Sequence, residues 1–520
     1  MARTDAAETI PVTAIGAHGG VKTGQDEGVA TLHPAYVEYM AQWARARDCC
    51  KGRDAVIAKG TEYVPRLKDQ KSDDYKAMVR RGSWYGASWR TVSGLSGMMF
   101  RKPPKIEAPE SIVKMLKEVD MAGTPIKTFC ERLANEILEV GRVGVYLDHS
   151  PLPAGFRGEP TALQREQLGL RPAMKMYLTE SITNWKHRHI GNRTVLSMVV
   201  LKERAVAKET EFFQEMKDQW RVLDLDAKGF FRVRVFQKDD RNKDIQIGAD
   251  VYPMRDSKLM TEIPFYPLNQ TGVDIWPYEP PLLDLFDLNL GHFRTSVDYE
   301  NGCHFTALPT PWIAGYQPGS GDDGEPVETT FQIGVPYAWT FADPQTKVGF
   351  LEFVGQGLSS LEKNMASKEA QMAVVGARMV QQQKNAPETF GTTAINRAGE
   401  NSVLASMAET ISTGISMALT AFAEWAGSPG ECKVTVNKDF LHVIIDTNML
   451  NALLQALQKG AISFETYFDV LQRGDIQPAE ISVEDELARI KKNPELIPDK
   501  PVDPPSAGQG KDPTDKPATA

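Results

Sequence analysis

The chain has 520 residues, of which 42% are apolar and 24% charged, and these are ordinary values for a soluble globular protein of roughly two to four domains. Its 68 acidic residues against 59 basic residues leave a formal charge of −9. A protein that grips nucleic acid needs Lys and Arg to neutralise phosphates. This balance therefore excludes a strong nucleic-acid binder, but not a protein past which DNA moves.

The cysteines and the N-terminal segment indicate the compartment. Cys49, Cys50, Cys130, Cys303 and Cys432 are odd in number and lack C-x-x-C spacing, so they predict neither a disulfide framework nor a zinc site. The N-terminus lacks a basic segment followed by an apolar run, and no window approaches 18 uninterrupted apolar residues. We expect a protein that stays in a reducing compartment and does not span a membrane.

The N-terminal third predicts a short arm and then helices. Residues 1–32 are rich in Gly, Thr and Ala and should form a disordered arm. Residues 34–51 place Met40 and Trp43 on one buried helical stripe, and residues 72–100 continue helically from an N-cap candidate at Ser72. Residues 124–140 form another amphipathic helix, after which "GRVGVYLDH" reads as a strand entered through a tight glycine junction.

The predicted secondary structure changes twice in the middle of the chain. Up to about residue 270, β-branched runs such as "TVLSMVVLKE" and "FFRVRVF" alternate with turn residues, which is typical of a mixed α+β domain. Residues 280–302 then read as a helix with Leu283, Phe286 and Leu290 on one face. Residues 303–341 are Pro and Gly rich with short strand-like pieces, which indicates a compact β excursion.

The last part is predicted to be helical. Residues 358–379 keep a three-four apolar spacing, and a polar break follows at "ARMVQQQKNAPETFGTTAINRAGENS". A long helix over 394–426 has an apolar stripe, and its other faces carry Ala, Ser, Thr and Gly, so we expect it to be packed on several sides. Helices capped by Ser463 and Ser482 come next, and a tail with seven prolines ends the chain.

Motifs for enzymatic chemistry are missing. The sequence contains no G-x-x-x-x-G-K-[ST], no H-E-x-x-H and no G-x-S-x-G, so we expect neither a nucleotide-driven motor nor an enzyme, and no cofactor or metal. A literal G-x-G-x-x-G occurs at Gly319, Gly321 and Gly324, but Asp322 and Asp323 would repel a pyrophosphate and no helix follows. We interpret it as an acidic loop tip.

Two further pairs of side chains could carry chemistry. His187 and His189 lie on one strand face and could share a metal, but no Cys or carboxylate ligand stands nearby, so surface histidines are the favoured interpretation. Asp224 and Asp226 also share a strand face, and paired acids can transfer protons. Acids that end a strand in solvent are the commoner arrangement.

Five blocks of the chain carry a family resemblance. They are "RDCCKGRDAVIAKGTEYVPRL", "WYGASWRTVSGLSGMMFRKPP", "EVGRVGVYLDH", "SITNW" and "QKGAISFETYFDVLQRGDI". In this order they resemble an uncharacterised-domain family encoded beside packaging genes in tailed bacteriophages, which itself resembles phage portal proteins, the head-to-tail connectors. The resemblance runs from about residue 33 to 490, and its most specific pieces, "MMFRKPP" and the "GAIS" turn, are not catalytic.

The resemblance implies a portal-like α+β fold with an α+β wing, a helical stem, a small β-containing clip, a long helix after a tunnel loop, and a C-terminal helical crown. The implied segments are an arm at 1–32, the wing at 33–279, the stem helix at 280–302, the clip at 303–357, the returning stem helix at 358–382, the tunnel loop at 383–393, the long helix and wing return at 394–447, the crown at 448–492 and a Pro-rich tail at 493–520.

The resemblance also explains the polar break, because a tunnel loop would project into a water-filled bore. The residues then expected to face DNA are Lys384, Asn385, Glu388, Thr389, Phe390, Thr392 and Arg397. An ordinary exposed helix-helix loop is the alternative. The excess of acid suits a bore, since a wall rich in Lys and Arg would hold DNA through counterion release.

The implied function is a homo-oligomeric ring, twelve subunits in the family, at the capsid vertex of a virion assembled in the host bacterial cytoplasm. Double-stranded DNA would pass through non-specifically during packaging and ejection, and the large terminase, head-tail adaptor proteins and the major capsid protein would dock on the ring. Two alternatives stay open. Another virion protein, an adaptor or a coat protein, would lack paired stem helices around a β excursion, and a soluble α/β enzyme with an unrecognised site would not need a closed ring.

Overall fold

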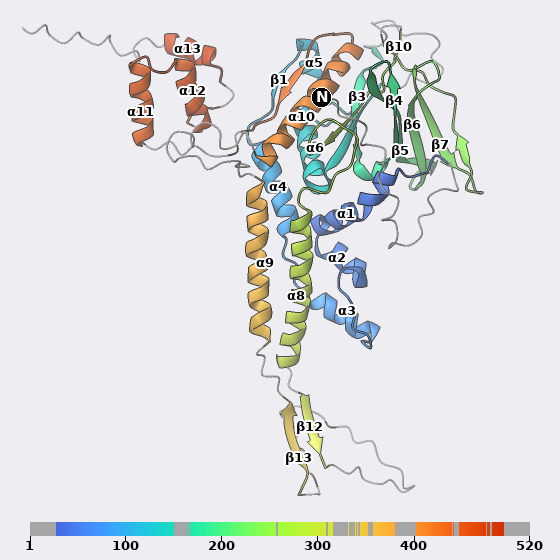
Figure 1. Ribbon diagram of the computed structural model, residues 1–520, viewed down its shortest axis with the longest axis vertical. Helices are drawn as coiled ribbons and strands as arrows, with labels where there is room; N and C mark the ends of the chain where they lie inside the picture. Colours follow the sequence, from blue (N-terminus) through green and yellow to red (C-terminus); the bar gives the residue numbers. More distant parts are fainter. Residues whose placement is uncertain are drawn as a thin grey trace, which may run out of the picture. The chain divides into compact units, whose positions relative to one another are not determined.

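The computed structural model of the protein describes residues 28–149, 164, 167–255, 258–307, 310–315, 331, 339, 341, 344–351, 357–379, 402–438, 440, 447–474, 476–478 and 481–492. The chain divides into two compact units, Met1–Phe440 and Leu441–Ala520. Helices and antiparallel sheets alternate along the first unit, and the second contains described helices (Figure 1). The fold class is therefore α+β, as the sequence predicts.

The first unit begins with a capped helix. In α1 (Pro34–Lys51) the imidazole Nδ1 of His33 accepts the Ala35 N–H at 3.1 Å, and Pro34 takes the first position, where a missing donor costs nothing. Trp43 is fully buried, as predicted. Met40 is 40% exposed, so its predicted burial is wrong, because it lies at the edge of the buried face. Gly52, with φ of 92°, ends the helix and leads into α2 (Arg53–Lys59).

The helix expected over residues 72–100 is two helices, α3 (Ser72–Arg81) and α4 (Ala87–Met99). The break begins at Gly82, where a Cβ would lie 2.4 Å from Val297 of α8 (Leu283–Ala307). The chain thus leaves helical geometry where it passes closest to another helix. Ser72 is the first helical residue of α3, and Lys71 precedes it in an extended conformation, so the N-cap assignment is wrong.

The glycine junction after α6 (Ile126–Val140) forms as predicted. Gly141, with a left-handed φ of 82°, turns the chain directly into β2 (Arg142–His149). β2 is the central strand of an antiparallel sheet, between β11 (Phe265–Asn269) and β3 (Pro172–Leu178). A Cβ on Gly144 would lie 2.3 Å from the Phe265 ring, so this glycine lets the two strands pack closely.

A second antiparallel sheet has five strands in sequence order, and β5 and β6 are its longest (Figure 1). Its strands are β4 (Ile182–Ile190), β5 (Arg193–Glu209), β6 (Gln214–Leu225), β7 (Phe231–Lys238) and β8 (Asp244–Gln246). The short strands β9 (Met254–Arg255) and β10 (Lys258–Leu259) form a separate pair.

The end of the predicted arm packs on this sheet. The Val29 N–H donates to Asp244 of β8 at 2.6 Å, and the Asn184 amide of β4 donates to the Thr31 carbonyl at 3.1 Å. Val29 and Ala30 cover a small apolar cluster on β5 and β6, formed by Val200, Trp220 and Val222. The expectation of a disordered arm is therefore wrong from residue 28 onward, because this segment buries apolar surface.

Two long helices flank a β-hairpin in the chain. α8 is followed by β12 (Thr310–Ala314), and β13 (Lys347–Leu351) precedes α9 (Leu358–Arg378). β12 pairs antiparallel with β13, and α8 and α9 lie side by side (Figure 1). α8 begins near the expected position but continues past residue 302, since its last turn hydrogen-bonds Thr306 Oγ1 to the Gly302 carbonyl at 3.0 Å.

α10 (Val403–Trp425) is the central helix of the first unit's core. It begins at Ser402, which is extended and whose Oγ accepts the Ala405 N–H at 3.1 Å. A helix running unbroken from residue 394 is therefore excluded at Ser402, and residues 394–401 lie outside the described part. Among the described helices, α10 is long and apolar enough to cross a membrane, but 61% of that window is buried within the protein.

After α10 the chain returns to the N-terminal part of the unit through β14 (Lys433–Thr435), which pairs with β1 (Lys105–Glu107). α5 (Glu110–Met115) follows β1. The second unit contains α11 (Thr447–Gln458), α12 (Phe464–Arg473) and α13 (Val483–Lys492). The predicted caps are confirmed, because the hydroxyls of Ser463 and Ser482 accept the N–H groups of Thr466 and Asp485 at 3.2 and 3.0 Å.

Candidate functional site

A polar seam joins the two long helices α8 and α9. The Lys368 ammonium donates to the Gly291 carbonyl at 2.9 Å and to Thr295 Oγ1 at 2.6 Å. One residue further along each helix, His292 Nε2 and Glu369 Oε1 are 3.1 Å apart. At the other end, a Cβ on Gly302 would lie 2.6 Å from Leu358. Since early residues of α8 meet late residues of α9, the helices are antiparallel, and hydrogen bonds fix their register.

The outer side of this pair is open. A groove of about 720 Å³ lies between the two helices, lined on the apolar side by Leu288, Val374 and Val375. α8 contributes two acids to its lining and α9 contributes two bases, which are Asp284, Asp287, Lys368 and Arg378. Burial lowers the pKa of Lys368. Met372 is the buried residue within α9, so most of this helix has solvent on its outer faces.

The ends of the segment between α9 and α10 meet. The Leu404 N–H donates to the Met379 carbonyl at 3.1 Å, and Met379 and Leu404 are both buried. The two ends of the segment 380–401 are therefore held together in the core. The predicted DNA-facing residues all belong to the segment between these two points and lie outside the described residues; they are Lys384, Asn385, Glu388, Thr389, Phe390, Thr392 and Arg397.

The small-residue face of α10 binds a strand of the same chain. The hydroxyl of Ser416 accepts the Val434 N–H at 2.8 Å, and that of Ser412 accepts the Val436 N–H at 3.0 Å. One turn further, Thr420 Oγ1 accepts the Cys432 N–H at 3.1 Å. These hydroxyls, spaced by four residues on one helix face, satisfy the backbone donors of β14 and its flanks. The four-residue spacing of Ser412, Ser416 and Thr420 is visible in the sequence, and it is the signal from which this contact with the segment 432–436 could have been predicted.

Another face of α10 meets the three-stranded sheet. A Cβ on Gly414 would lie 2.0 Å from Leu268 of β11, so only glycine allows this approach. The expectation that α10 is packed on several sides is confirmed. The partners on these sides are β11 and β14 of the same chain.

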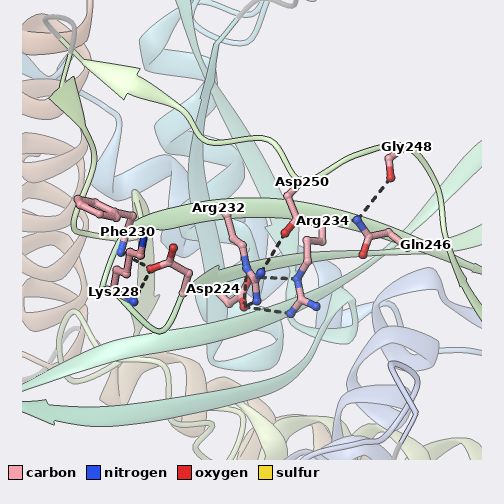
Figure 2. A network of polar contacts seen from close by, with 9 residues as sticks. Asp224, Lys228, Phe230, Arg232, Arg234, Gln246, Gly248 and Asp250 are labelled. Carbon is pink, nitrogen blue, oxygen red and sulfur yellow. Dashed lines mark hydrogen bonds and ion pairs between the residues drawn. The ribbon is translucent and has the colours of Figure 1, made fainter.

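The paired acids of the predicted "LDLD" site are separated in the structure. Asp224 accepts hydrogen bonds from the guanidinium groups of Arg232 and Arg234, and Arg232 also contacts Asp250 at 2.9 Å (Figure 2). The Asp226 carboxylate instead accepts the backbone N–H groups of the turn into β7, which lowers its pKa. Asp224 thus holds together neighbouring strands, and the arrangement does not resemble an acid–base pair.

The two histidines considered as a metal pair, His187 and His189, also make contacts within the fold. His187 stacks on Trp276 with ring centroids 6.1 Å apart, and His189 Nδ1 lies 3.0 Å from Thr194 Oγ1. Within the described residues no group of His, Cys, Asp and Glu side chains has the arrangement of a metal site. The G-x-G-x-x-G at Gly319, Gly321 and Gly324 lies outside the described residues.

Arg142 is a buried cation that sequence reasoning missed. Its side chain lies between the rings of Trp43 and Trp185, with Cζ 5.2 and 4.9 Å from their centroids. It donates to the Thr179 hydroxyl and to the carbonyls of Thr179, Ile182 and Ile275. Burial lowers its pKa to about 9. The arginine of "GRVG" gave no sequence signal, because its partners come from three distant parts of the chain, at Trp43, at residues 179–185 and at Ile275.

Comparisons with known proteins give a family domain and distant structures. The model described as "Domain of unknown function (DUF4055)" matches residues 281–426, which contain α8, α9 and α10. A chain of the "Neck of empty GTA particle computed with C6 symmetry" is 14% identical with a TM-score of 0.37, and one of the "Neck of native GTA particle computed with C12 symmetry" is 13% identical with a TM-score of 0.33. Each alignment covers 81% of this chain and 98% of the other.

No curated protein matches the chain.

Proposed function

We propose that the protein is a phage portal protein, whose copies close into a ring at the capsid vertex and form a conduit for the genome. The observation that carries the proposal is the order of α8, the β12–β13 hairpin, α9 and α10. An outgoing helix, a β-hairpin and an antiparallel returning helix form one excursion. It is followed by a segment anchored at both ends by the Met379–Leu404 hydrogen bond.

This order suits a conduit for a physical reason. The α8–α9 pair is held in register by Lys368, so it can transmit force along its length without sliding. The segment 380–401 starts and ends on the buried base formed by Met379 and Leu404, and its loop composition is polar. A polar loop fixed at its base can line a bore, and the net charge of −9 keeps DNA from being held there by many phosphate contacts.

The exposed faces of α9 supply the argument for assembly. A helix in water gains most of its stability from the burial of one face, yet Met372 is the buried residue inside α9. In a closed ring each subunit contacts the next through two different surfaces, so the outer side of α9 would be covered by a neighbouring copy. This gives the outer side of α9 a partner that the described part of a single chain does not supply.

The first test is the size and shape of the purified protein. With 57.6 kDa per chain, a ring of about twelve copies has a mass of roughly 690 kDa. Negative-stain images should show closed rings with a central hole, and native mass spectrometry should give a multiple of the chain mass. A protein that stays monomeric at micromolar concentration, as expected of a soluble enzyme, would contradict the proposal.

A ring alone does not distinguish a portal from a head-tail adaptor, so the second test removes the loop. We expect that replacing residues 384–392 with a Gly-Ser linker of equal length leaves folding and ring formation unchanged, because Met379 and Leu404, which form the buried base, are retained. Heads that contain the variant ring should retain less DNA than heads with the natural loop. Full genome retention in heads whose ring is seen by imaging would show that the loop does not contribute to transport.

A further inference from the structure

One guanidinium group meets three carboxylates in the interior of the first unit. Arg47 of α1 contacts Glu136 and Glu139, which are one turn apart on α6, and Glu180 of the short helix η3 (Thr179–Ser181). The side chains of Arg47, Glu136 and Glu139 are 15%, 13% and 9% exposed, and that of Glu180 is 39% exposed. We call these four residues the Arg47 cluster.

The three acids are not equivalent. Glu136 accepts hydrogen bonds from Nη1 and Nη2 of Arg47, and Glu180 accepts from Nε at 2.8 Å and from Nη2 at 3.2 Å. Glu139 contacts Nη1 at 2.9 Å as an ion pair. Nη1 thus faces two carboxylates at once. Because a guanidinium group has five N–H donors and two acids already accept four of these hydrogen bonds, Glu139 is the least compensated member.

The charge of the cluster is unbalanced if every acid is ionised. One cation then faces three anions, two of which are largely removed from water, and burial of uncompensated charge is costly. The neighbouring groups do not restore the balance. Burial raises the pKa of the Cys50 thiol beside Glu139 and of the Tyr36 phenol, which donates to the Glu180 carbonyl, so both are neutral. The other nearby cation, Arg142, interacts electrostatically with Glu180, the most exposed of the three acids.

We propose that Glu139 takes up one proton from solvent, and that loss of this proton above neutral pH loosens α1 from α6 and η3. The protonated carboxyl lowers the charge beside Arg47 from three anions to two and removes the repulsion between the two glutamates of α6. Deprotonation restores both penalties, and detaching α1 relieves them by admitting water to the carboxylates.

The direction of the effect follows from the acids' titration. Burial raises the pKa of Glu139 from 4.5 to about 7, against the opposing effect of Arg47, and burial also raises the pKa of Glu136. A group whose pKa is raised in the folded state stabilises that state at low pH. Its contribution is lost as pH rises from about 4.5 through 7.

α1 connects the cluster to the long helix α8. Two residues before Arg47, the Arg45 guanidinium donates to Asp287 of α8 at 2.7 Å, and two residues after Arg47, the Cys49 thiol contacts the Phe286 carbonyl at 3.7 Å. A change in how firmly α1 is held therefore reaches the base of the α8–α9 pair. The attachment of α1, which connects the Arg47 cluster to α8, therefore depends on this proton.

The test is hydrogen exchange of the α1 amides, residues 34–51, in the full chain between pH 6 and 8. Protection factors corrected for the intrinsic exchange rate should fall by about ten-fold over this range in the wild type, given a shift from 4.5 to about 7. Glu139→Gln keeps the shape and removes the charge, so its α1 should stay protected across the range. At pH 8 the variant should be more protected than the wild type.

Glu131→Gln is the matched control, because Glu131 lies on the same helix and pairs with Lys127 instead of Arg47. It should show the wild-type loss of protection. A second measurement follows the proton itself. The infrared band of a protonated carboxyl group should be present in the wild type at pH 6, lost at pH 8, and absent from Glu139→Gln at both. A wild type with constant protection, or a Glu139→Gln variant that loses protection as the wild type does, would overturn the proposal.

Discussion

α9 and α10 are consecutive helices of similar length with very different surroundings. α10 buries residues on several faces, among them Leu404, Ile411 and Phe422, whereas α9 buries Met372. Both carry many small residues, so composition alone does not distinguish them. The difference teaches that small residues permit close approach but do not say which partner approaches. In α10 that partner is the same chain, and in α9 the outer faces have no partner within the described residues.

The hydroxyl pattern separates the two helices better than residue size. In α10, Ser412, Ser416 and Thr420 recur every fourth residue and accept N–H groups from the segment 432–436. Backbone donors of a strand that lies against a helix need such acceptors, because they cannot be left unpaired in the core. The sequence predicted that α10 is packed on several sides but did not identify the partners, which in the structure are β11 and β14 of the same chain.

The largest expected effect comes from adding a single carbon to α10. Gly414→Ala places a Cβ 2.0 Å from the side chain of Leu268 and 3.5 Å from Val273, so the fully buried Leu268 side chain or one of the two elements has to shift. Overpacking of this kind costs about 1–3 kcal/mol, and the midpoint of denaturant unfolding should fall accordingly. Gly94→Ala in α4 is the matched control, since its Cβ would meet nothing within 4 Å. It should stabilise by roughly 0.5–1 kcal/mol through helix propensity. Equal effects of both variants would mean that α10 is loosely packed.

A comparable loss is expected when one hydroxyl of the row formed by Ser412, Ser416 and Thr420 is removed. Ser416→Ala removes the acceptor of the Val434 N–H at 2.8 Å and leaves that donor unpaired beside a buried residue. An unsatisfied buried donor costs about 1–3 kcal/mol. The amides of 432–436 should also exchange faster. Ser360→Ala on exposed α9 should change stability by less than about 0.5 kcal/mol. If Ser416→Ala changes stability as little as Ser360→Ala, the attachment of β14 does not depend on the hydroxyls of α10.

Local signals predicted the elements whose causes are local. The caps at Ser463 and Ser482, the glycine junction at Gly141 and the buried stripe of α10 depend on residues close in sequence, and all are confirmed. The break after α3 was missed although Gly82 and Gly86 flank it, because glycine also occurs inside helices and the close contact at this break, with Val297, comes from far away in the chain.

The candidate site was predicted only in outline. The sequence indicated a polar segment between two helices, and the structure adds that the residues bounding it, Met379 and Leu404, are joined by a hydrogen bond. The polar seam was missed, because Lys368 looks like any surface lysine until Gly291 is placed opposite it. The Arg47 cluster was missed for the same reason, since its acids come from two other elements.

The seam gives a prediction of intermediate size for α9. Lys368→Met keeps the aliphatic stem and removes the hydrogen bonds to the Gly291 carbonyl and Thr295 Oγ1, which should cost about 0.5–1.5 kcal/mol. The loss should appear as faster hydrogen exchange in α9 with little change in α10. Lys363→Met, an exposed lysine of the same helix, serves as the control and should leave exchange unchanged. Faster exchange in both helices would show that α9 and α10 unfold together, which removes the contrast between them.

A substitution on the outer face of α9 should change folding least and ring assembly most. Ala370 lines the α8–α9 groove and is exposed, so Ala370→Glu should change the stability of the isolated chain by less than about 0.5 kcal/mol. If a neighbouring copy covers this face, the same substitution buries an unpaired carboxylate at the contact and should prevent ring formation. Thermal unfolding and native mass spectrometry of the same sample separate the two effects. Ala207→Glu, an identical exchange at an exposed position of β5, should leave assembly intact. Rings of Ala370→Glu at wild-type concentration would show that this face of α9 points to solvent in the assembly, and the ring contact would then have to be sought on another surface.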